Sequence, residues 1–221
     1  MNNRTGSISA TFCTTCAIGK YQNIIGSSYC NDCMSGYYNN ISGQSSCKEC
    51  PLGTYNTMTG SNNIDDCIRC NIGTYSNTTA SNTISNCIYT PIGTFTNNSG
   101  SSNYIECRPG TYQNATNQSN CIKCTAGTFN IYSGSNNSIY CLPSPPGFYV
   151  PLNGSSIFFP CKPGTFSNVS GSIECLPCSI GFYTNTVNSV QCIKCPIGTF
   201  TLGFGFKECQ SIGNVSIELV D

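Results

Sequence analysis

The sequence predicts a small disulfide-rich repeat protein. We expect an elongated rod of about eleven tandem hairpin-like repeats of 17–20 residues, with little regular secondary structure (short β-strands), no helix and no large core. Three observations predict this fold. The chain has 19 Cys among 221 residues, one motif recurs along it at a nearly fixed spacing, and its apolar residues are spread too evenly to form one large core.

The repeated motif is Cys-x-x-Cys-x-x-Gly followed, one residue later, by Tyr or Phe. In the first repeat its second Cys, Gly and aromatic residue are Cys16, Gly19 and Tyr21. The period is 17 residues and is stretched to 20 in three repeats. Because a short period means small units stacked on one another, each repeat should contact only its neighbours.

The repeat register defines the expected domain organisation. Residues 13–209 form the repeat array, which is weakened at 87–107 and 141–161, where cysteines are missing. Residues 1–12 are the tail of a preceding partial repeat. Residues 210–221 leave the repeat and alternate in polarity like a β-strand, which is suited to begin another domain or to dock on a neighbouring chain.

Two turns are expected in each repeat. The motif glycine often follows a proline, which is typical of a β-turn. A second small residue lies ten positions after each second Cys; it is Gly in eight repeats, Ala80 in one, and Asn117 and Asn188 in two. Gly and Asn tolerate a positive φ, so this position predicts the turn of a hairpin whose first strand carries the aromatic residue. No segment has helical periodicity.

The degenerate repeats predict which cysteines pair. Thr90 and Ser144 each replace a second Cys, and the first Cys of the following repeat is then also missing, at Tyr104 and Phe158 respectively. This pattern is expected if the second Cys of one repeat bonds the first Cys of the next. The predicted pairs are Cys16–Cys30, Cys33–Cys47, Cys50–Cys67, Cys70–Cys87, Cys107–Cys121, Cys124–Cys141, Cys161–Cys175, Cys178–Cys192 and Cys195–Cys209. Pairing within each Cys-x-x-Cys would instead leave Cys87, Cys107, Cys141, Cys161 and Cys209 unpaired.

Cys13 has no partner in this scheme. By the repeat register its partner would lie about four residues before Met1, or else Cys13 bonds another chain. No signal peptide is visible in residues 1–12, although a secreted protein normally has one. We therefore expect the sequence to begin inside a repeat of a longer protein.

The cysteine content and the sequons predict an extracellular or cell-surface glycoprotein that passes through the secretory pathway. Asn-x-Ser/Thr occurs at Asn3, Asn40, Asn77, Asn97, Asn114, Asn117, Asn136, Asn153, Asn168 and Asn214. These ten asparagines are the candidate sites for N-linked glycans, and no other cofactor is expected.

The segments Cys47–Tyr55 and Cys192–Phe200 resemble the ephrin-receptor-like cysteine-rich repeat. A single loop is similar to the first module of tumour necrosis factor receptor cysteine-rich domains, which joins its two cysteines in the way inferred above. Similar arrays are found in large extracellular surface proteins of protists. The resemblance implies a stalk, a spacer or a ligand-binding ectodomain. The loops between the cysteines depart from the receptor families, since they are monotonous in Asn, Ser, Thr and Gly.

Composition argues against several other classes. The chain has no His, which excludes Ser-His-Asp and Cys-His catalysis, and no enzyme is expected. With zero net charge and scattered Lys and Arg, it lacks a footprint for nucleic acid. No apolar run is long enough to span a bilayer.

Metal and redox sites are the remaining alternatives. Cys13, Cys16, Cys30 and Cys33 have the spacing of a zinc ribbon, but the shared, repeating cysteines favour a disulfide ladder. A redox Cys-x-x-Cys requires a helix N-terminus that this sequence does not predict. The acidic doublet at Asp65 lacks the spacing of a calcium loop.

The sequence therefore predicts an extracellular structural glycoprotein, acting as the subunit of a fibre or filament, as a stalk or as a surface coat. Its expected partners are copies of itself or neighbouring segments of a longer chain. The alternative is a receptor or adhesin ectodomain that binds a protein or carbohydrate ligand, for which residues 144–161 are the first candidate. Aromatic residues outside the motif are candidates for the surface: Tyr29, Tyr37, Tyr89, Tyr104, Phe158, Phe159, Phe182, Phe204 and Phe206.

Overall fold

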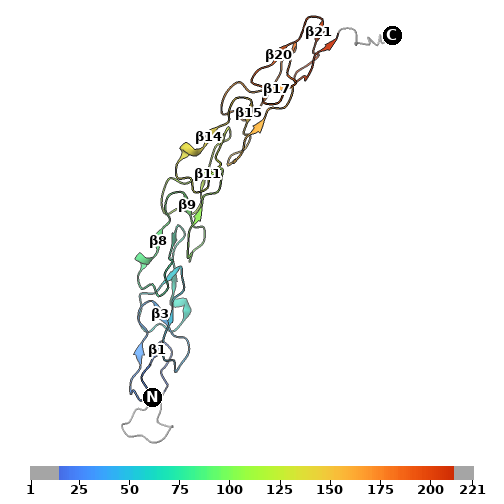
Figure 1. The fold of residues 1–221 in the computed structure, drawn as a ribbon. Coiled ribbons are helices and arrows are strands. Elements are labelled where there is room, and N and C mark those ends of the chain that lie inside the picture. Colours follow the sequence, from blue (N-terminus) through green and yellow to red (C-terminus); the bar gives the residue numbers. More distant parts are fainter. Residues whose placement is uncertain (1–14, 212–221) are drawn as a thin grey trace, which may run out of the picture. The chain divides into compact units, whose positions relative to one another are not determined.

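The computed structural model describes residues 15–211, and they form eleven two-stranded antiparallel hairpins in succession (Figure 1). The first ten strands are β1 (Lys20–Tyr21), β2 (Asn31–Asp32), β3 (Tyr37–Tyr38), β4 (Lys48–Glu49), β5 (Thr54–Tyr55), β6 (Ile68–Arg69), β7 (Thr74–Tyr75), β8 (Ile88–Tyr89), β9 (Thr94–Phe95) and β10 (Ile105–Glu106). The others are β11 (Thr111–Tyr112), β12 (Ile122–Lys123), β13 (Thr128–Phe129), β14 (Leu142–Pro143), β15 (Phe148–Tyr149), β16 (Phe159–Pro160), β17 (Thr165–Phe166), β18 (Leu176–Pro177), β19 (Phe182–Tyr183), β20 (Ile193–Lys194), β21 (Thr199–Phe200) and β22 (Gln210–Ser211). The predicted class, a disulfide-rich array of short hairpins, is confirmed.

The chain divides into two units. One comprises Met1–Glu106 with Ala115–Asn120, and the other Cys107–Asn114 with Cys121–Asp221. We call them the amino-terminal and carboxy-terminal units.

The first turn of each hairpin is a β-turn with glycine at its third position. In hairpin β5–β6, Gly53 has φ +75°, and the Thr54 N–H and hydroxyl both donate to the carbonyl of Pro51, at 3.2 and 2.7 Å. A positive φ at the third turn position is the signature of a type II turn, which requires glycine. Seven hairpins have a threonine that closes this turn in the same way: Thr54, Thr74, Thr94, Thr111, Thr128, Thr165 and Thr199.

The second turn lies where the sequence predicts it. All eleven residues at this position have a positive φ, including Ala80 at +52°, Asn117 at +60° and Asn188 at +59°. Asparagine adopts this conformation more readily than other non-glycine residues, whereas alanine pays a steric cost through its Cβ.

The three stretched repeats carry a short 3-10 helix, which a search for helical periodicity does not detect. These turns are η2 (Ile64–Asp66), η3 (Ile84–Asn86) and η4 (Ser138–Tyr140). Each ends directly before the first Cys of the following motif, and so accounts for the three extra residues. No α-helix occurs in residues 15–211.

Successive hairpins within a unit are joined by backbone hydrogen bonds. Between β5–β6 and β7–β8, Gly53 N donates to Ser76 O (2.8 Å), Asn56 N to Ser81 O (2.9 Å) and Ala80 N to Cys50 O (3.0 Å). These bonds take up polar groups that would otherwise be left unpaired inside a chain with very short strands.

Eight of the hairpins also contact the hairpin after next, which corrects the expectation that a repeat touches only its neighbours. A Cβ built on Gly53 would lie 2.0 Å from the carbonyl oxygen of Gly100, in hairpin β9–β10. The same close approach joins Gly19 to Gly60, and Gly110 to Gly154. In these hairpins glycine is therefore needed for two reasons. Its φ is positive, and a backbone carbonyl lies too close to leave room for a Cβ.

The array also extends two residues further than expected. Gln210 and Ser211 belong to the array rather than to the segment that leaves the repeat, because they form β22 and pair with β21. They directly follow Cys209, and in the other hairpins the second strand likewise follows the first Cys of the next motif or the aromatic residue that replaces it. The rest of that segment, and residues 1–14, lie outside the described residues.

Candidate functional site

The disulfides form a ladder along the described chain. They join Cys16–Cys30, Cys33–Cys47, Cys50–Cys67, Cys70–Cys87, Cys107–Cys121, Cys124–Cys141, Cys161–Cys175, Cys178–Cys192 and Cys195–Cys209. These are the nine pairs that the degenerate repeats predict. The paired Cα atoms are 5.5–5.8 Å apart, within the usual range for a disulfide. Cys13 lies outside the described residues.

In hairpin β3–β4 the motif aromatic residue packs against the disulfide of the next hairpin. Tyr38 forms a buried cluster with Cys50 and Cys67. The other motif aromatics are half-buried. They face an aliphatic side chain across the hairpin in several repeats, such as Tyr55 opposite Ile68. The apolar core is thus very small, and in hairpin β3–β4 it is centred on sulfur.

Buried polar side chains recur along the interior of the array, and we call them the polar column. The sequence did not predict them. The residue after each motif aromatic is at most 3% exposed in ten hairpins: Asn39, Asn56, Ser76, Thr96, Gln113, Asn130, Val150, Ser167, Thr184 and Thr201. Val150 is the one apolar member. Since burying an unpaired polar group is costly, these side chains need partners within the protein.

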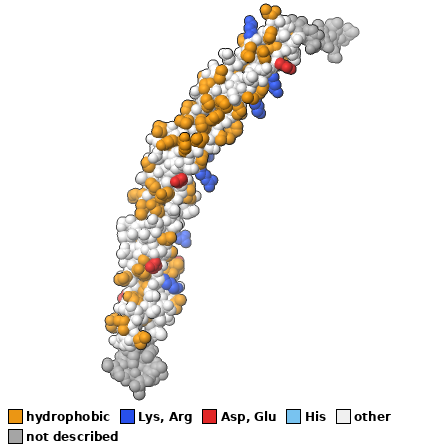
Figure 2. All heavy atoms as spheres, in the orientation of Figure 1, with side chains coloured by type: hydrophobic (Ala, Val, Ile, Leu, Met, Phe, Trp, Pro, Cys, Tyr) orange, Lys and Arg blue, Asp and Glu red, His pale blue; other side chains and the backbone are white. Residues whose placement is uncertain are grey.

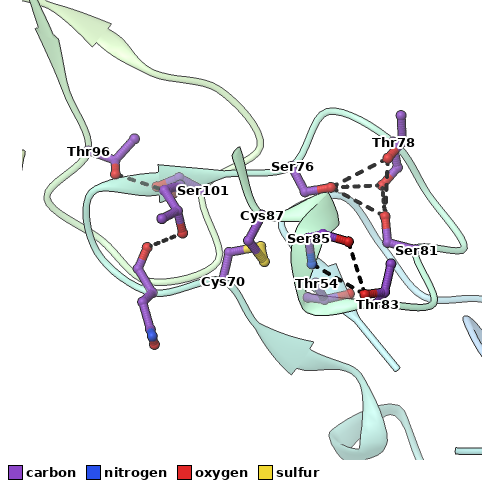
Figure 3. The surroundings of a disulfide bond; sticks show 12 residues. Thr54, Cys70, Ser76, Thr78, Ser81, Thr83, Ser85, Cys87, Thr96 and Ser101 are labelled. Carbon is purple, nitrogen blue, oxygen red and sulfur yellow. Dashed lines mark hydrogen bonds between the residues drawn. A yellow bond between two sulfur atoms is a disulfide. The ribbon is translucent and has the colours of Figure 1, made fainter. Parts of the chain in front are cut away.

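Asn56 shows how such a residue is satisfied. Its Nδ2 donates to Ser61 Oγ (2.8 Å) and to Tyr37 O in the preceding hairpin (3.2 Å), while its Oδ1 accepts from Met58 N (3.0 Å). Figure 3 shows a hydroxyl version near the Cys70–Cys87 disulfide, in which Ser81 bonds both Ser76 and Thr78. The interior therefore depends on hydrogen bonds as much as on apolar contact.

An aromatic side chain takes the place of the missing disulfide in both degenerate hairpins. Tyr104 packs edge-on against Tyr75, with ring centroids 5.3 Å apart. Phe158 packs between Phe129 (4.8 Å) and Phe148 (4.9 Å). Tyr75 and Phe129 are the motif aromatics of the preceding hairpins, so each meets a ring, whereas Tyr38 meets a disulfide.

Where a disulfide is missing, the second Cys of the motif is replaced by a small polar residue. Thr90 and Ser144 are fully buried. Their backbone N–H groups donate to Gly73 O (3.0 Å) and Gly127 O (2.9 Å), the same bond that Cys70 makes to Gly53. Residues 141–161 thus keep the hydrogen bonding of the array. Phe158, which was a surface candidate, lies instead within an aromatic cluster, whereas Phe159 is exposed.

The described sequon asparagines lie on the surface. Eight are exposed: Asn40, Asn77, Asn97, Asn114, Asn117, Asn136, Asn153 and Asn168. Five of them occupy the same position, directly after the buried polar residue: Asn40, Asn77, Asn97, Asn114 and Asn168. Asn3 and Asn214 lie outside the described residues. Their exposure makes these side chains accessible to modification.

Charged side chains are few and the surface has many exposed aliphatic ones (Figure 2). Lys20 and Asp32 form an ion pair at the surface, where such pairs contribute little to stability. Among the described residues, no group of three His, Cys, Asp or Glu side chains is arranged to hold a metal ion. No helix in that part of the chain is long and apolar enough to cross a membrane.

One hollow lies in the amino-terminal unit, away from residues 144–161. Its volume is about 530 Å³, and it lies between hairpins β5–β6 and β7–β8. Tyr55, Ile68, Arg69, Ile84 and Tyr89 line it.

The model of one protein family matches most of the array. This family is described as tyrosine-protein kinase ephrin type A/B receptor-like, and its model matches residues 25–67, 93–141 and 164–210. The chain belongs to the ephrin-receptor-like family. The three matched segments contain six of the disulfides described above and cover more than half of the sequence. No curated protein matches the chain.

Membership of the ephrin-receptor-like family fits the disulfide ladder. Disulfides persist in oxidising compartments, so the ladder and the family together indicate an extracellular domain. Ephrin-receptor-like repeats are generally non-catalytic, and domains of this family bind protein ligands. The family does not distinguish a structural array from a receptor ectodomain.

Proposed function

We propose that the chain is an extracellular structural glycoprotein, the subunit of a fibre, a stalk or a surface coat. The observation that carries this proposal is the continuity of the repeat contacts. Even around Ser144, where a disulfide is missing, Gly147 N bonds Ser167 O (2.8 Å), Val150 N bonds Ser172 O (2.9 Å) and Gly171 N bonds Ser144 O (2.8 Å). A chain that keeps one contact pattern throughout is suited to hold a length or a spacing.

The ladder supplies the mechanical part of this function. Each disulfide closes a loop that, in the chain-entropy model, stabilises the folded hairpin by about 3 kcal/mol. Small repeats with little apolar surface to bury need such covalent support. A pull along the chain is then resisted by covalent bonds in most repeats.

N-linked glycans supply the protective part. Exposed aliphatic side chains flank several sequons: Ile41 follows Asn40, Leu152 precedes Asn153, and Val169 follows Asn168. A glycan on each asparagine would cover these side chains and hinder proteases. Enzymatic removal of N-linked glycans should lower the mass of the secreted protein, and an unchanged mass would contradict this part of the proposal.

Copies of the same chain are the proposed partners. Zero net charge removes the long-range repulsion that keeps highly charged proteins apart. Electron microscopy of native, unreduced material tests the assembly. Regular filaments with sugar density along the repeats would support the proposed structural role. Isolated particles that end in another domain would contradict the proposal that copies assemble into a filament.

A receptor or adhesin ectodomain is the second candidate, and the 530 Å³ hollow favours it. Two tyrosines, exposed isoleucines and the single cation of Arg69 suit a neutral ligand with an apolar face, such as a carbohydrate. A glycan array probed with the chain and with its Tyr89→Ala variant tests this candidate. Binding that the variant loses supports it, and absence of binding by the wild-type chain counts against a carbohydrate ligand.

A further inference from the structure

The three hairpins with a 3-10 turn share one local plan. In each, a buried serine is followed by an asparagine. The residue four positions after this asparagine is the last one before the first Cys of the next motif. These segments are 61–67, 81–87 and 135–141. In the first, Asp66 closes a capping box, because its Oδ2 accepts from Asn62 N (3.0 Å) and Asn63 N (3.1 Å).

The third hairpin departs from this plan at two positions. Tyr140 replaces the capping residue, and Tyr132 stands where the other two hairpins have Met58 and Thr78. The two rings meet edge to face with centroids 6.3 Å apart. Both remain largely exposed, Tyr132 at 54% and Tyr140 at 38%. The hairpin keeps the cap from Asn137, whose side chain accepts from Ile139 N at 3.0 Å, but it lacks the carboxylate contacts.

The asparagine of this hairpin is also the one of the three that lies in a sequon. Asn136 is followed by Asn137 and Ser138, whereas the segments at Asn62 and Asn82 have isoleucine at the third position. Asn136, Tyr132 and Tyr140 together line a hollow of about 260 Å³. The two exposed rings and the modifiable asparagine therefore occur in the same hairpin and border the same space.

We propose that the first sugar residue of an N-linked glycan on Asn136 packs in this hollow against Tyr132 and Tyr140. A pyranose ring has an apolar C–H face that packs on an aromatic ring, and the phenol groups are able to hydrogen-bond its polar edge. The volume is below the roughly 300 Å³ minimum of pockets for drug-sized ligands, so it suits one sugar residue. This inference rests on the proposed glycosylation.

The glycan would then support the hairpin where the capping carboxylate is missing. The test is a cycle of variants made in a host with N-linked glycosylation, with occupancy at Asn136 read by glycopeptide mass spectrometry. Asn136→Gln should lower the melting temperature by about 2–4 °C in the wild-type background. The same change should have no effect when Tyr132→Ala and Tyr140→Ala are already present.

Two controls separate packing from general effects. Asn168→Gln removes an exposed sequon in a hairpin without a 3-10 turn, so its effect should be the same in both backgrounds. Tyr132→Phe with Tyr140→Phe keeps both rings, so the dependence on Asn136 should persist. If the alanine variants do not fold, the wild-type glycoprotein still provides a readout, because protons of the first sugar should be shifted upfield in its NMR spectrum by the aromatic rings.

The outcomes are distinct. Asn136 could carry a glycan and yet Asn136→Gln could shift the melting temperature equally in both backgrounds, or the sugar protons could have ordinary chemical shifts. Either result overturns this inference but not the proposal that the protein is glycosylated. If Asn136 carries no glycan while other sequons do, this inference is overturned but the proposed glycosylation is not. A chain with no glycan at any sequon overturns both.

Discussion

In eight hairpins the motif glycine is restricted both by its positive φ and by its surroundings. Each of these eight glycines has a backbone oxygen or the Asn117 amide oxygen within 2.0–2.5 Å of the place where a Cβ would lie. Real Cβ atoms do not approach so closely, hence any side chain there must displace the hairpin after next. Gly181 has the same positive φ, +80°, but no described atom lies within 4 Å of its Cβ position.

This contrast gives a matched pair of substitutions. Gly53→Ala and Gly181→Ala should both cost about 1–2 kcal/mol through the positive φ. Gly53→Ala should cost at least about 2 kcal/mol more, because its Cβ would lie 2.0 Å from Gly100 O. Denaturant unfolding of the two variants measures the difference, and equal losses would contradict the contact between alternate hairpins.

The second turn is predictable from sequence, but the buried polar column is not. Gly, Asn and Ala recur ten residues after each second Cys, and that composition alone indicates a positive φ. The column at Asn39, Asn56 and Ser76 has no comparable signal, because Asn, Ser and Thr also fill the exposed loops. The usable clue was position, because the residue lies directly after the motif aromatic and a serine or glutamine follows five residues later in nine of the ten hairpins.

At the scale of the element, the 3-10 turns differ in their capping. Asn86 occupies the position of Asp66, but its Oδ1 is buried without a hydrogen-bond partner among the described residues. A carboxylate accepts two backbone N–H groups at this position in the preceding hairpin. The amide therefore leaves a cap incomplete.

Asn86→Asp should complete this cap. We expect a gain of about 0.5–1 kcal/mol in the free energy of unfolding at neutral pH, and the reverse change Asp66→Asn should lose a similar amount. Thermal unfolding of both variants checks the pair. A loss of stability in Asn86→Asp would show that the two turns are not equivalent.

The degenerate hairpins should accept the disulfide that they lack. Thr90 and Tyr104 are separated by 14 residues, the separation of the disulfides in the 17-residue repeats. Thr90→Cys with Tyr104→Cys should therefore form a tenth disulfide, seen as a loss of two mass units and no additional free thiol. The loop closure contributes about 3 kcal/mol, and loss of the tyrosine packing offsets most of this gain.

The single variant Thr90→Cys is the control, and it should expose one reactive thiol on unfolding. Free thiols at both positions in the oxidised double variant would contradict the repeat register through this hairpin. The sequence predicted the loss of each pair. It did not reveal the replacement, since Tyr104 and Phe158 are recognisable as substitutes only once their contacts with Tyr75 and Phe129 are seen.

At the scale of the whole molecule, the disulfides are the main source of order. The largest fully buried side chains in the described part of the chain include few apolar residues other than cysteine. Net stabilities of folded domains are about 5–15 kcal/mol. Several loops that each contribute about 3 kcal/mol therefore account for the order of each unit, although such contributions do not add strictly.

Reduction should unfold both units. After reduction and alkylation of all cysteines, we expect the amide signals in the NMR spectrum to collapse to the narrow range of an unfolded chain. Persistent dispersion would show that the hydrogen-bonded interior is stable by itself. The sequence predicted this dependence from its cysteine count and its thin apolar content, but it did not predict the contact between alternate hairpins. That contact joins residues about 40 apart through backbone atoms, which leave no mark in side-chain patterns.

Peptide mapping of the native, unreduced protein by mass spectrometry tests the central claim most directly. The account predicts that the second Cys of each motif is linked to the first Cys of the next, as in Cys33–Cys47 and Cys50–Cys67. Links within a motif, such as Cys30 to Cys33, or free thiols that bind metal, would contradict both the ladder and the extracellular function built on it.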